Sequence, residues 1–181
     1  MADTAQRRTV GLPTAAWLDA HEPLTRFIFR GNAAARAEAG RAFGVSFSDT
    51  ACRASTDGVR AALWLGPDEQ LLLAPDGTVE AIEAALAQAL AGHAYSLVDV
   101  SHRQVAFDVR GPHAEWLLES QCPLPLNLRD FPVGMCTRTI FGKAEVVLWR
   151  PAEQVFRVEV WRSFSLYVVQ MLHEVARELP A

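Results

Sequence analysis

Cysteine is scarce in this 181-residue chain, and the three that occur, Cys52, Cys122 and Cys136, lie far apart with no Cys-x-x-Cys pair. An odd, widely spaced set argues against a disulfide framework and against a zinc site. The five histidines are also scattered, and no two of them have the i,i+3 or i,i+4 spacing of helix-borne ligands. The sequence therefore predicts no metal centre.

Long apolar runs and basic patches are missing as well. The longest alanine-rich stretch, residues 81–91, is interrupted by Glu83 and Gln88, whereas a membrane span needs about 20 apolar residues. No apolar segment near the N-terminus resembles a signal peptide. The formal charge of −4 is not that of a nucleic-acid-binding protein. We expect a cytoplasmic protein that binds neither a membrane nor nucleic acid.

Sequence motifs for bound nucleotides and for common hydrolases are absent too. The chain has no glycine-rich dinucleotide fingerprint, no phosphate-binding loop, no His-Glu-x-x-His and no Gly-x-Ser-x-Gly. We therefore expect that the chain by itself holds no nucleotide cofactor.

Half of the residues are apolar, enough for the core of one domain of about 150 to 200 residues. An internal repeat runs through this core. Its offset is 80, and it matches Phe27, Arg30 and Gly31 with Phe107, Arg110 and Gly111. In both copies a strand-like run passes through the glycine into a helix. The first helix is predicted over 33–43, with Asn32 as N-cap and Gly44 as the residue that ends it.

Each half continues with a hairpin and a closing helix. Residues 67–71, Pro-Asp-Glu-Gln-Leu, recur as residues 151–155, Pro-Ala-Glu-Gln-Val, at an offset of 84, and each copy joins two strand-like runs. The closing helices are predicted over 79–91 and about 164–178. The second half has an extra strand, 136–141, which turns at Gly142-Lys143 into the run 144–149.

These elements predict an α+β fold. With residues 95–101 as a last strand, the pattern is two tandem β-α-β-β-α-β units of the ferredoxin-like, split βαβ type, with antiparallel sheets. We expect an N-terminal extension over 1–22 and a single domain over 23–181, with pseudo-repeats 24–101 and 103–178.

Two catalytic interpretations are unfavourable. Asp99, Ser101 and His102 suggest a triad, but on a strand His102 points to the opposite face from the other two, so a direct serine–histidine hydrogen bond is prevented. Glu145 and Glu159 lie on strands without an acidic neighbour, and a cross-strand ion pair with an arginine is the simpler role for each.

Aromatic and arginine side chains are frequent between residues 138 and 164, and both are enriched in protein interfaces. They form a candidate partner-binding surface of six residues, namely Arg138, Trp149, Arg157, Trp161, Arg162 and Phe164. Packing of the two tryptophans in the core is an equally good alternative. We assign no catalytic, cofactor-binding or metal-binding residue.

The second half also carries a family resemblance. Residues 98–102 (Val-Asp-Val-Ser-His), the strand 105–109 and the segment 111–118 are similar to the N-terminal signature of the glycine-cleavage T-protein superfamily of folate enzymes. A longer series, which includes 122–124 (Cys-Pro-Leu), 134–139 (Gly-Met-Cys-Thr-Arg-Thr), 142–145 (Gly-Lys-Ala-Glu) and 159–164 (Glu-Val-Trp-Arg-Ser-Phe), resembles the gamma-subunit family of heterotetrameric sarcosine oxidases.

This resemblance implies a structural, non-catalytic subunit with the fold of the N-terminal part of T-protein-like enzymes. The complex would demethylate sarcosine to glycine, pass the one-carbon unit to tetrahydrofolate and produce hydrogen peroxide. Its alpha subunit would hold NAD and the folate site, its beta subunit FAD and FMN, and its delta subunit zinc. The acidic pair of T-proteins has no counterpart at 142–146, which agrees with a chain that binds no cofactor of its own. The alternatives are a stand-alone folate-binding one-carbon enzyme and a scaffold protein of the same fold.

Overall fold

The computed structural model describes residues 9–11 and 17–178, which belong to two compact units. The first unit spans residues 23–102. The second combines residues 103–178 with the described residues that precede residue 23. Residues 9–11 and 17–20 of the expected N-terminal extension form strands. That residues 23–181 behave as a single domain stays a prediction.

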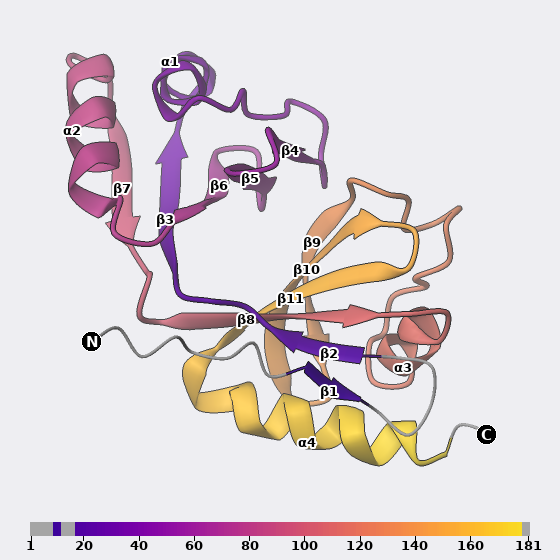
Figure 1. Cartoon of the computed structure of the whole chain (residues 1–181). Helices are drawn as coiled ribbons and strands as arrows, with labels where there is room; N and C mark the ends of the chain where they lie inside the picture. Colours follow the sequence, from indigo (N-terminus) through magenta and orange to yellow (C-terminus); the bar gives the residue numbers. More distant parts are fainter. Residues whose placement is uncertain (1–8, 12–16, 179–181) are drawn as a thin grey trace, which may run out of the picture. The chain divides into compact units, whose positions relative to one another are not determined.

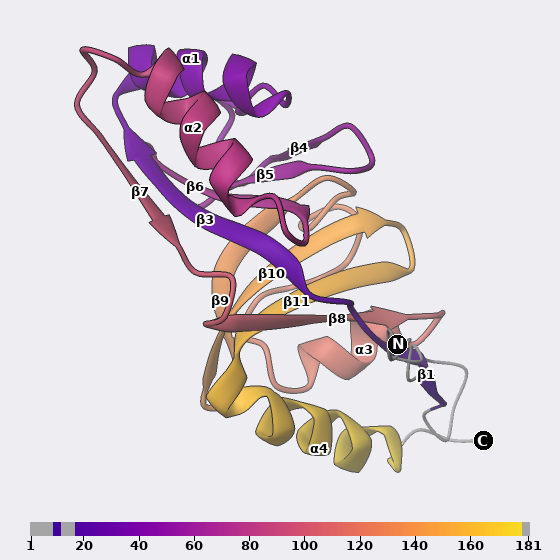
Figure 2. The same cartoon turned by 60° about the vertical axis from the view of Figure 1, so that its left-hand side comes forward.

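The first unit is a five-stranded antiparallel sheet with two helices on one face (Figure 2). Its elements are β3 (Leu24–Gly31), α1 (Ala33–Phe43), β4 (Ala54–Thr56), β5 (Ala61–Trp64), β6 (Glu69–Pro75), α2 (Val79–Ala89) and β7 (Tyr95–Asp99), and the strand order is β4-β5-β6-β3-β7. Asn32 caps α1 by accepting the Ala35 N–H at 2.9 Å, and Gly44 ends the helix with φ 87°, so both predicted caps are confirmed. The apolar stripe of α2, Ile82, Leu86 and Leu90, is buried against the sheet.

The second unit is a six-stranded antiparallel sheet that packs against α3 and α4 (Figure 1). Its elements are β1 (Thr9–Gly11), β2 (Trp17–Ala20), β8 (Gln104–Arg110), α3 (Ala114–Glu119), β9 (Cys136–Phe141), β10 (Ala144–Ala152), β11 (Val155–Trp161), the 3-10 turn η1 (Arg162–Phe164) and α4 (Ser165–Ala176). The strand order is β1-β2-β8-β11-β10-β9. Alternate residues of the central strands, among them Val109, Phe156 and Val158, point toward α4 and form the core.

The two units have corresponding elements in the same order, so the predicted α+β fold with antiparallel sheets is confirmed. β3 corresponds to β8, β6 to β11, β5 to β10 and β4 to β9. Two details differ from the sequence prediction. The strand expected only in the second half, β9, has a counterpart in β4 of the first half. The last strand of the second unit is β2, which pairs with β8 as β7 pairs with β3, although β2 precedes the unit in the chain.

The strand-to-helix glycines are equivalent, whereas the hairpin motifs are not. Gly31 and Gly111 each follow the first strand of their unit, and their N–H groups donate to Asp68 O and Gln154 O at 3.0 and 2.9 Å. In the structure, Glu69 lies opposite Arg30 and Val155 lies opposite Arg110, so Glu69 and Val155 are the equivalent residues. The Pro-x-Glu-Gln match of the sequence paired Glu69 with Glu153 instead, which is two residues away from the structural equivalence. Because side chains alternate between the two faces of a strand, a shift of two residues leaves the same positions facing the core. The repeat could therefore still be recognised in the sequence.

Arg150 on β10 holds together the long segment between α3 and β9. The residue is 2% exposed, and its guanidinium donates to Leu126 O at 2.6 Å, Phe131 O at 3.0 Å and Glu153 O at 3.1 Å. It also lies 4.6 Å from the centre of the Phe156 ring. A planar fork of five donors suits this task, because several carbonyl groups that no strand or helix satisfies converge on one side chain.

Arg150→Met should destabilise the chain by about 3 kcal/mol or more, because the buried carbonyls would lose their donors. Arg129, an exposed arginine in the same segment, provides the matched control. Arg129→Met should stay within about 0.5 kcal/mol of the wild type. Urea unfolding of the two variants measures the difference, and equal midpoints would show that Arg150 does not stabilise the segment.

Candidate partner-binding surface

The six candidate interface residues divide into an exposed group and a buried group. Trp161 and Phe164 are 43% and 41% exposed, and Arg138 and Arg162 are exposed as well. Trp149 and Arg157 are 9% and 8% exposed and therefore belong to the interior. The structure thus retains four of the six as surface residues and assigns the other two to packing.

Three of the exposed residues gather where β11 passes into α4. We call Arg103, Trp161, Arg162 and Phe164 the corner patch. The Arg162 N–H donates to Arg103 O at 2.9 Å, and the Arg103 guanidinium lies 5.5 Å from the centre of the Trp161 ring. Phe164 packs edge-on against Tyr167 at 6.5 Å between ring centres. Rigid aromatic rings beside arginines are typical of residues that contribute much of the binding energy in protein interfaces.

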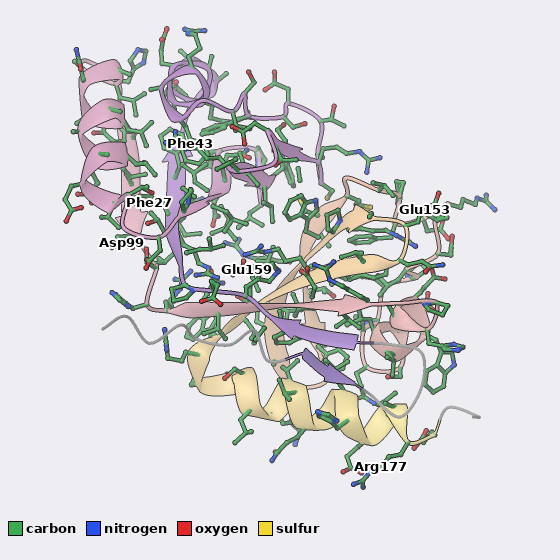
Figure 3. All side chains as sticks on the ribbon, in the orientation of Figure 1. Phe27, Phe43, Asp99, Glu153, Glu159 and Arg177 are labelled. Atoms are coloured by element: carbon green, nitrogen blue, oxygen red, sulfur yellow. The ribbon has the colours of Figure 1, made fainter. Side chains whose placement is uncertain are left out.

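Arg157 lies in a buried charge network on the face of the sheet opposite α3 and α4. It donates through Nε and Nη2 to Glu159 Oε1 at 2.9 and 2.6 Å, and its Nη1 is 3.5 Å from His21 Nδ1. His21 Nε2 contacts Asp108 Oδ1 at 2.7 Å, and Arg110 contacts the other oxygen of that carboxylate. Figure 3 shows Glu159 on β11, apart from Glu153 at the end of the β10–β11 hairpin.

This network differs from the pairing that the sequence suggested. Glu159 is 1% exposed and bonds to Arg157 two residues away on its own strand, whereas a cross-strand pair was expected. Arg157 lies opposite Asp108 and Trp149 in the sheet, and Glu145 lies opposite Ile140. The sequence did contain a signal for these same-strand pairs, namely the alternations Asp-Val-Arg at 108–110 and Arg-Val-Glu at 157–159. Residues i and i+2 share one face of a strand, so the two charged residues of each triplet lie side by side.

Asp108 is 4% exposed, and burial of its carboxyl raises the pKa of this group. The hydrogen bond from His21 and the charges of His21, Arg110 and Arg157 act in the opposite direction and prevail, so the pKa of Asp108 lies below its ordinary value. The carboxylate is therefore held in its charged form as part of the folded structure.

Ser101 and His102 of the candidate triad lie beyond the end of β7, and not on the strand where the sequence argument placed them. β7 ends at Asp99, and the Ser101 hydroxyl donates to Asp99 Oδ1 at 2.5 Å while it accepts the Arg26 N–H at 2.9 Å. The serine thus closes a local turn. Within 9–11 and 17–178, no group of three or more His, Cys, Asp or Glu side chains has the arrangement of a metal site. No helix in this range is long and apolar enough to cross a membrane.

A pocket of about 340 Å³ opens beside α3. Gly111, Trp116 and Leu128 contribute to its wall, together with Glu119 and Glu153. Arg150 also borders it, but its guanidinium is already bonded to three backbone carbonyls and to Glu115 at 3.3 Å. The pocket therefore offers no arginine for binding an anion.

The fold defines a class of protein. Glycine cleavage system aminomethyltransferase T from Bartonella henselae matches 88% of this chain and 45% of its own length, with a TM-score of 0.67 and 14% sequence identity. This likeness shows that the two proteins share the T-protein fold.

A more specific match narrows the class. A chain of the heterotetrameric sarcosine oxidase from Corynebacterium sp. U-96 superposes with a TM-score of 0.86 and 29% identity over 96% of this chain and 89% of that one. The profile of the sarcosine oxidase, gamma subunit family matches residues 30–178, and the chain belongs to this family. The match includes most of the first unit. In the sequence analysis, this half resembled the family only in its length and in the internal repeat.

Individual relatives agree with this assignment. Sarcosine oxidase subunit gamma from Corynebacterium sp. strain P-1 is 35% identical over 118 residues, and that from Arthrobacter sp. is 36% identical over 118 residues. Each alignment covers 65% of this chain and 57% of the relative. The chain thus spans little more than half the length of these relatives.

The lowered pKa of Asp108 predicts a pH dependence of stability. Since the folded-state pKa is below the unfolded-state value of about 3.9, the stabilisation is present above pH 4 and is lost as the pH falls through the folded-state pKa. Asp108→Asn should cost about 1–3 kcal/mol at neutral pH and progressively less in acid. Asp76→Asn, at an exposed carboxylate, is the control. Unfolding curves measured from pH 7 to 2.5 would contradict the prediction if the cost of Asp108→Asn were constant.

Proposed function

We propose that this chain is the structural gamma subunit of a heterotetrameric sarcosine oxidase. The observation that carries the proposal is the TM-score of 0.86 with a chain of such a complex, over nearly the full length of both chains. Membership of the gamma subunit family supports it. The chain would contribute surface and rigidity to the complex, and the chemistry would take place on other subunits.

The complex proposed here is a cytoplasmic oxidoreductase that demethylates sarcosine to glycine. It passes the one-carbon unit to tetrahydrofolate and releases hydrogen peroxide. The partners are an alpha subunit with NAD and the folate site, a beta subunit with FAD and FMN, and a delta subunit with zinc. The way this chain uses its charged groups supports a structural role, because Asp108, Arg157 and Glu159 are buried and bonded to neighbouring side chains.

The corner patch is the proposed contact with a large partner subunit. Trp161 supplies the apolar area, and the Arg103 guanidinium lies over its ring, where it would restrict the motion of the tryptophan side chain. Restricting a side chain before binding lowers the entropic cost of association. Arg162 adds a planar set of donors at the start of η1.

Trp161→Ala should weaken assembly by about 2 kcal/mol or more while the chain keeps its folding stability. Trp149→Ala should have the converse effect and cost about 3–5 kcal/mol of folding stability. Trp116, 42% exposed on α3, is the matched control, and Trp116→Ala should leave assembly unchanged. Co-purification with the co-expressed partner subunits measures assembly, and urea unfolding measures stability. Equal losses of assembly for Trp161→Ala and Trp116→Ala would exclude the corner patch as the contact.

The isolated chain should bind neither tetrahydrofolate nor flavin. Calorimetric titration tests both ligands, with the assembled complex as the positive control. Micromolar binding of tetrahydrofolate to the chain by itself, about −8 kcal/mol, would instead favour the stand-alone folate enzyme. Failure of the wild-type chain to associate with any of the co-expressed subunits would favour the scaffold protein.

A further inference from the structure

The sheet of the first unit ends at β7, and within 9–11 and 17–178 no strand pairs with its outer edge. The corresponding strand of the second unit, β2, does have an outer neighbour, because β1 pairs with it antiparallel from Thr9↔Asp19 to Gly11↔Trp17. β2 and β7 thus occupy the same position in the fold. A further strand follows it in the second unit, and none of the described strands follows it in the first unit. The chain itself demonstrates that this position can accept an additional strand.

The open edge of β7 presents backbone donors and acceptors. The Val100 N–H donates to Arg26 O at 2.8 Å, at the point where the β3–β7 ladder continues beyond Phe27↔Asp99. Residues of an antiparallel pair alternate between bonding to the neighbour and pointing away from it. The N–H and C=O groups of Tyr95, Leu97 and Asp99 therefore point to the outer edge, while those of Ser96 and Val98 bond to β3.

β7 also lacks the features that usually protect an edge strand. Its sequence, Tyr-Ser-Leu-Val-Asp, contains no lysine, arginine or proline, and basic side chains and proline are common means of blocking edge pairing. Val98 and Tyr95 are 50% and 39% exposed. The outer strands β4 and β1 have only three residues each, and β9 carries the exposed Arg138. Among the described edge strands, β7 is thus the one with more than three residues and no basic side chain.

The side chains of β7 define which segment would fit. Leu97 packs against the core under α1 and α2, and Tyr95 stacks on Phe29 with 6.3 Å between ring centres. A strand added beside them would extend this core if its residues on the same face were apolar. The only charged residue of β7 is the exposed Asp99, so a basic residue on the added strand would complement it.

We propose that β7 is a docking edge for an extended segment of a partner subunit, with alternating apolar residues and a basic residue opposite Asp99. The segment adds a sixth strand to the first unit, as β1 does to the second. Backbone hydrogen bonds provide affinity in this mode of recognition, and alternate side chains provide specificity. The identity of the partner as a subunit of the oxidase rests on the proposed function; the use of β7 as an edge rests on the geometry.

Hydrogen–deuterium exchange of the full chain, free and in the co-expressed complex, tests the proposal directly. Peptides over residues 93–100 should contain outward amides that exchange rapidly in the free chain and at least about 100-fold more slowly in the complex. Wild-type chain that co-purifies with its partners but shows the same exchange in both states would overturn the docking edge and leave the proposed function intact. Protection that appears in the free chain as its concentration rises would identify a second copy as the occupant and would also overturn the proposal.

A pair of variants gives an independent readout. Val98→Lys places a charge on the edge strand and should lower the affinity for the partner subunits at least about tenfold. Val59→Lys is the matched control, because Val59 is 70% exposed outside any strand, and it should assemble normally. Equal assembly of the two variants would overturn the proposal. If the wild-type chain assembled with no partner subunit, both the proposed function and the proposed partner segment on β7 would be excluded.

Discussion

The central strand β8 must satisfy its backbone along both edges, and much of the second unit depends on how it does so. One edge is paired along its length with β11, and the other is paired with β2 from the N-terminal part of the chain. The His21–Asp108 contact follows directly after β2 and joins the two segments through side chains. The unit is therefore complete only when residues 17–22 and 103–178 come together. The contacts between these two segments join residues far apart in the sequence, so forming them entails a large loss of loop-closure entropy.

Buried arginines perform structural work in both units. Arg150 collects the carbonyls of an irregular segment, and Arg36 in the first unit donates to Ser48 O at 2.7 Å and Pro67 O at 3.2 Å. Irregular backbone has carbonyl groups without partners in a strand or helix, and one guanidinium can satisfy several of them. Arginine content is therefore an ambiguous sign of an interface in this protein, since the interior also requires it.

The two proposed contact regions have different physical characters. The corner patch would bind through side chains, with Trp161 held by Arg103, and its strength would depend on desolvation of an aromatic ring. The β7 edge would bind through backbone groups, and its strength would depend on register. A subunit with both would contribute a rigid surface and an unpaired strand edge to the proposed assembly.

The sequence by itself determined most of the element types, the helix caps at Asn32 and Gly44, the equivalence of Gly31 and Gly111, and the family, because each depends on local chemistry or on residue order. Tertiary structure decided which of the arginines and tryptophans are buried. Arg157 and Trp161 occupy the same face of one strand at i and i+4, yet the first lies mid-strand in a charge network and the second at the strand end in solvent. Tertiary structure also decided that β2 and β1 extend the second sheet, whereas no strand among the described residues pairs with the outer edge of β7. Strand pairing joins residues far apart in the chain, and no local pattern specifies the partner of an edge.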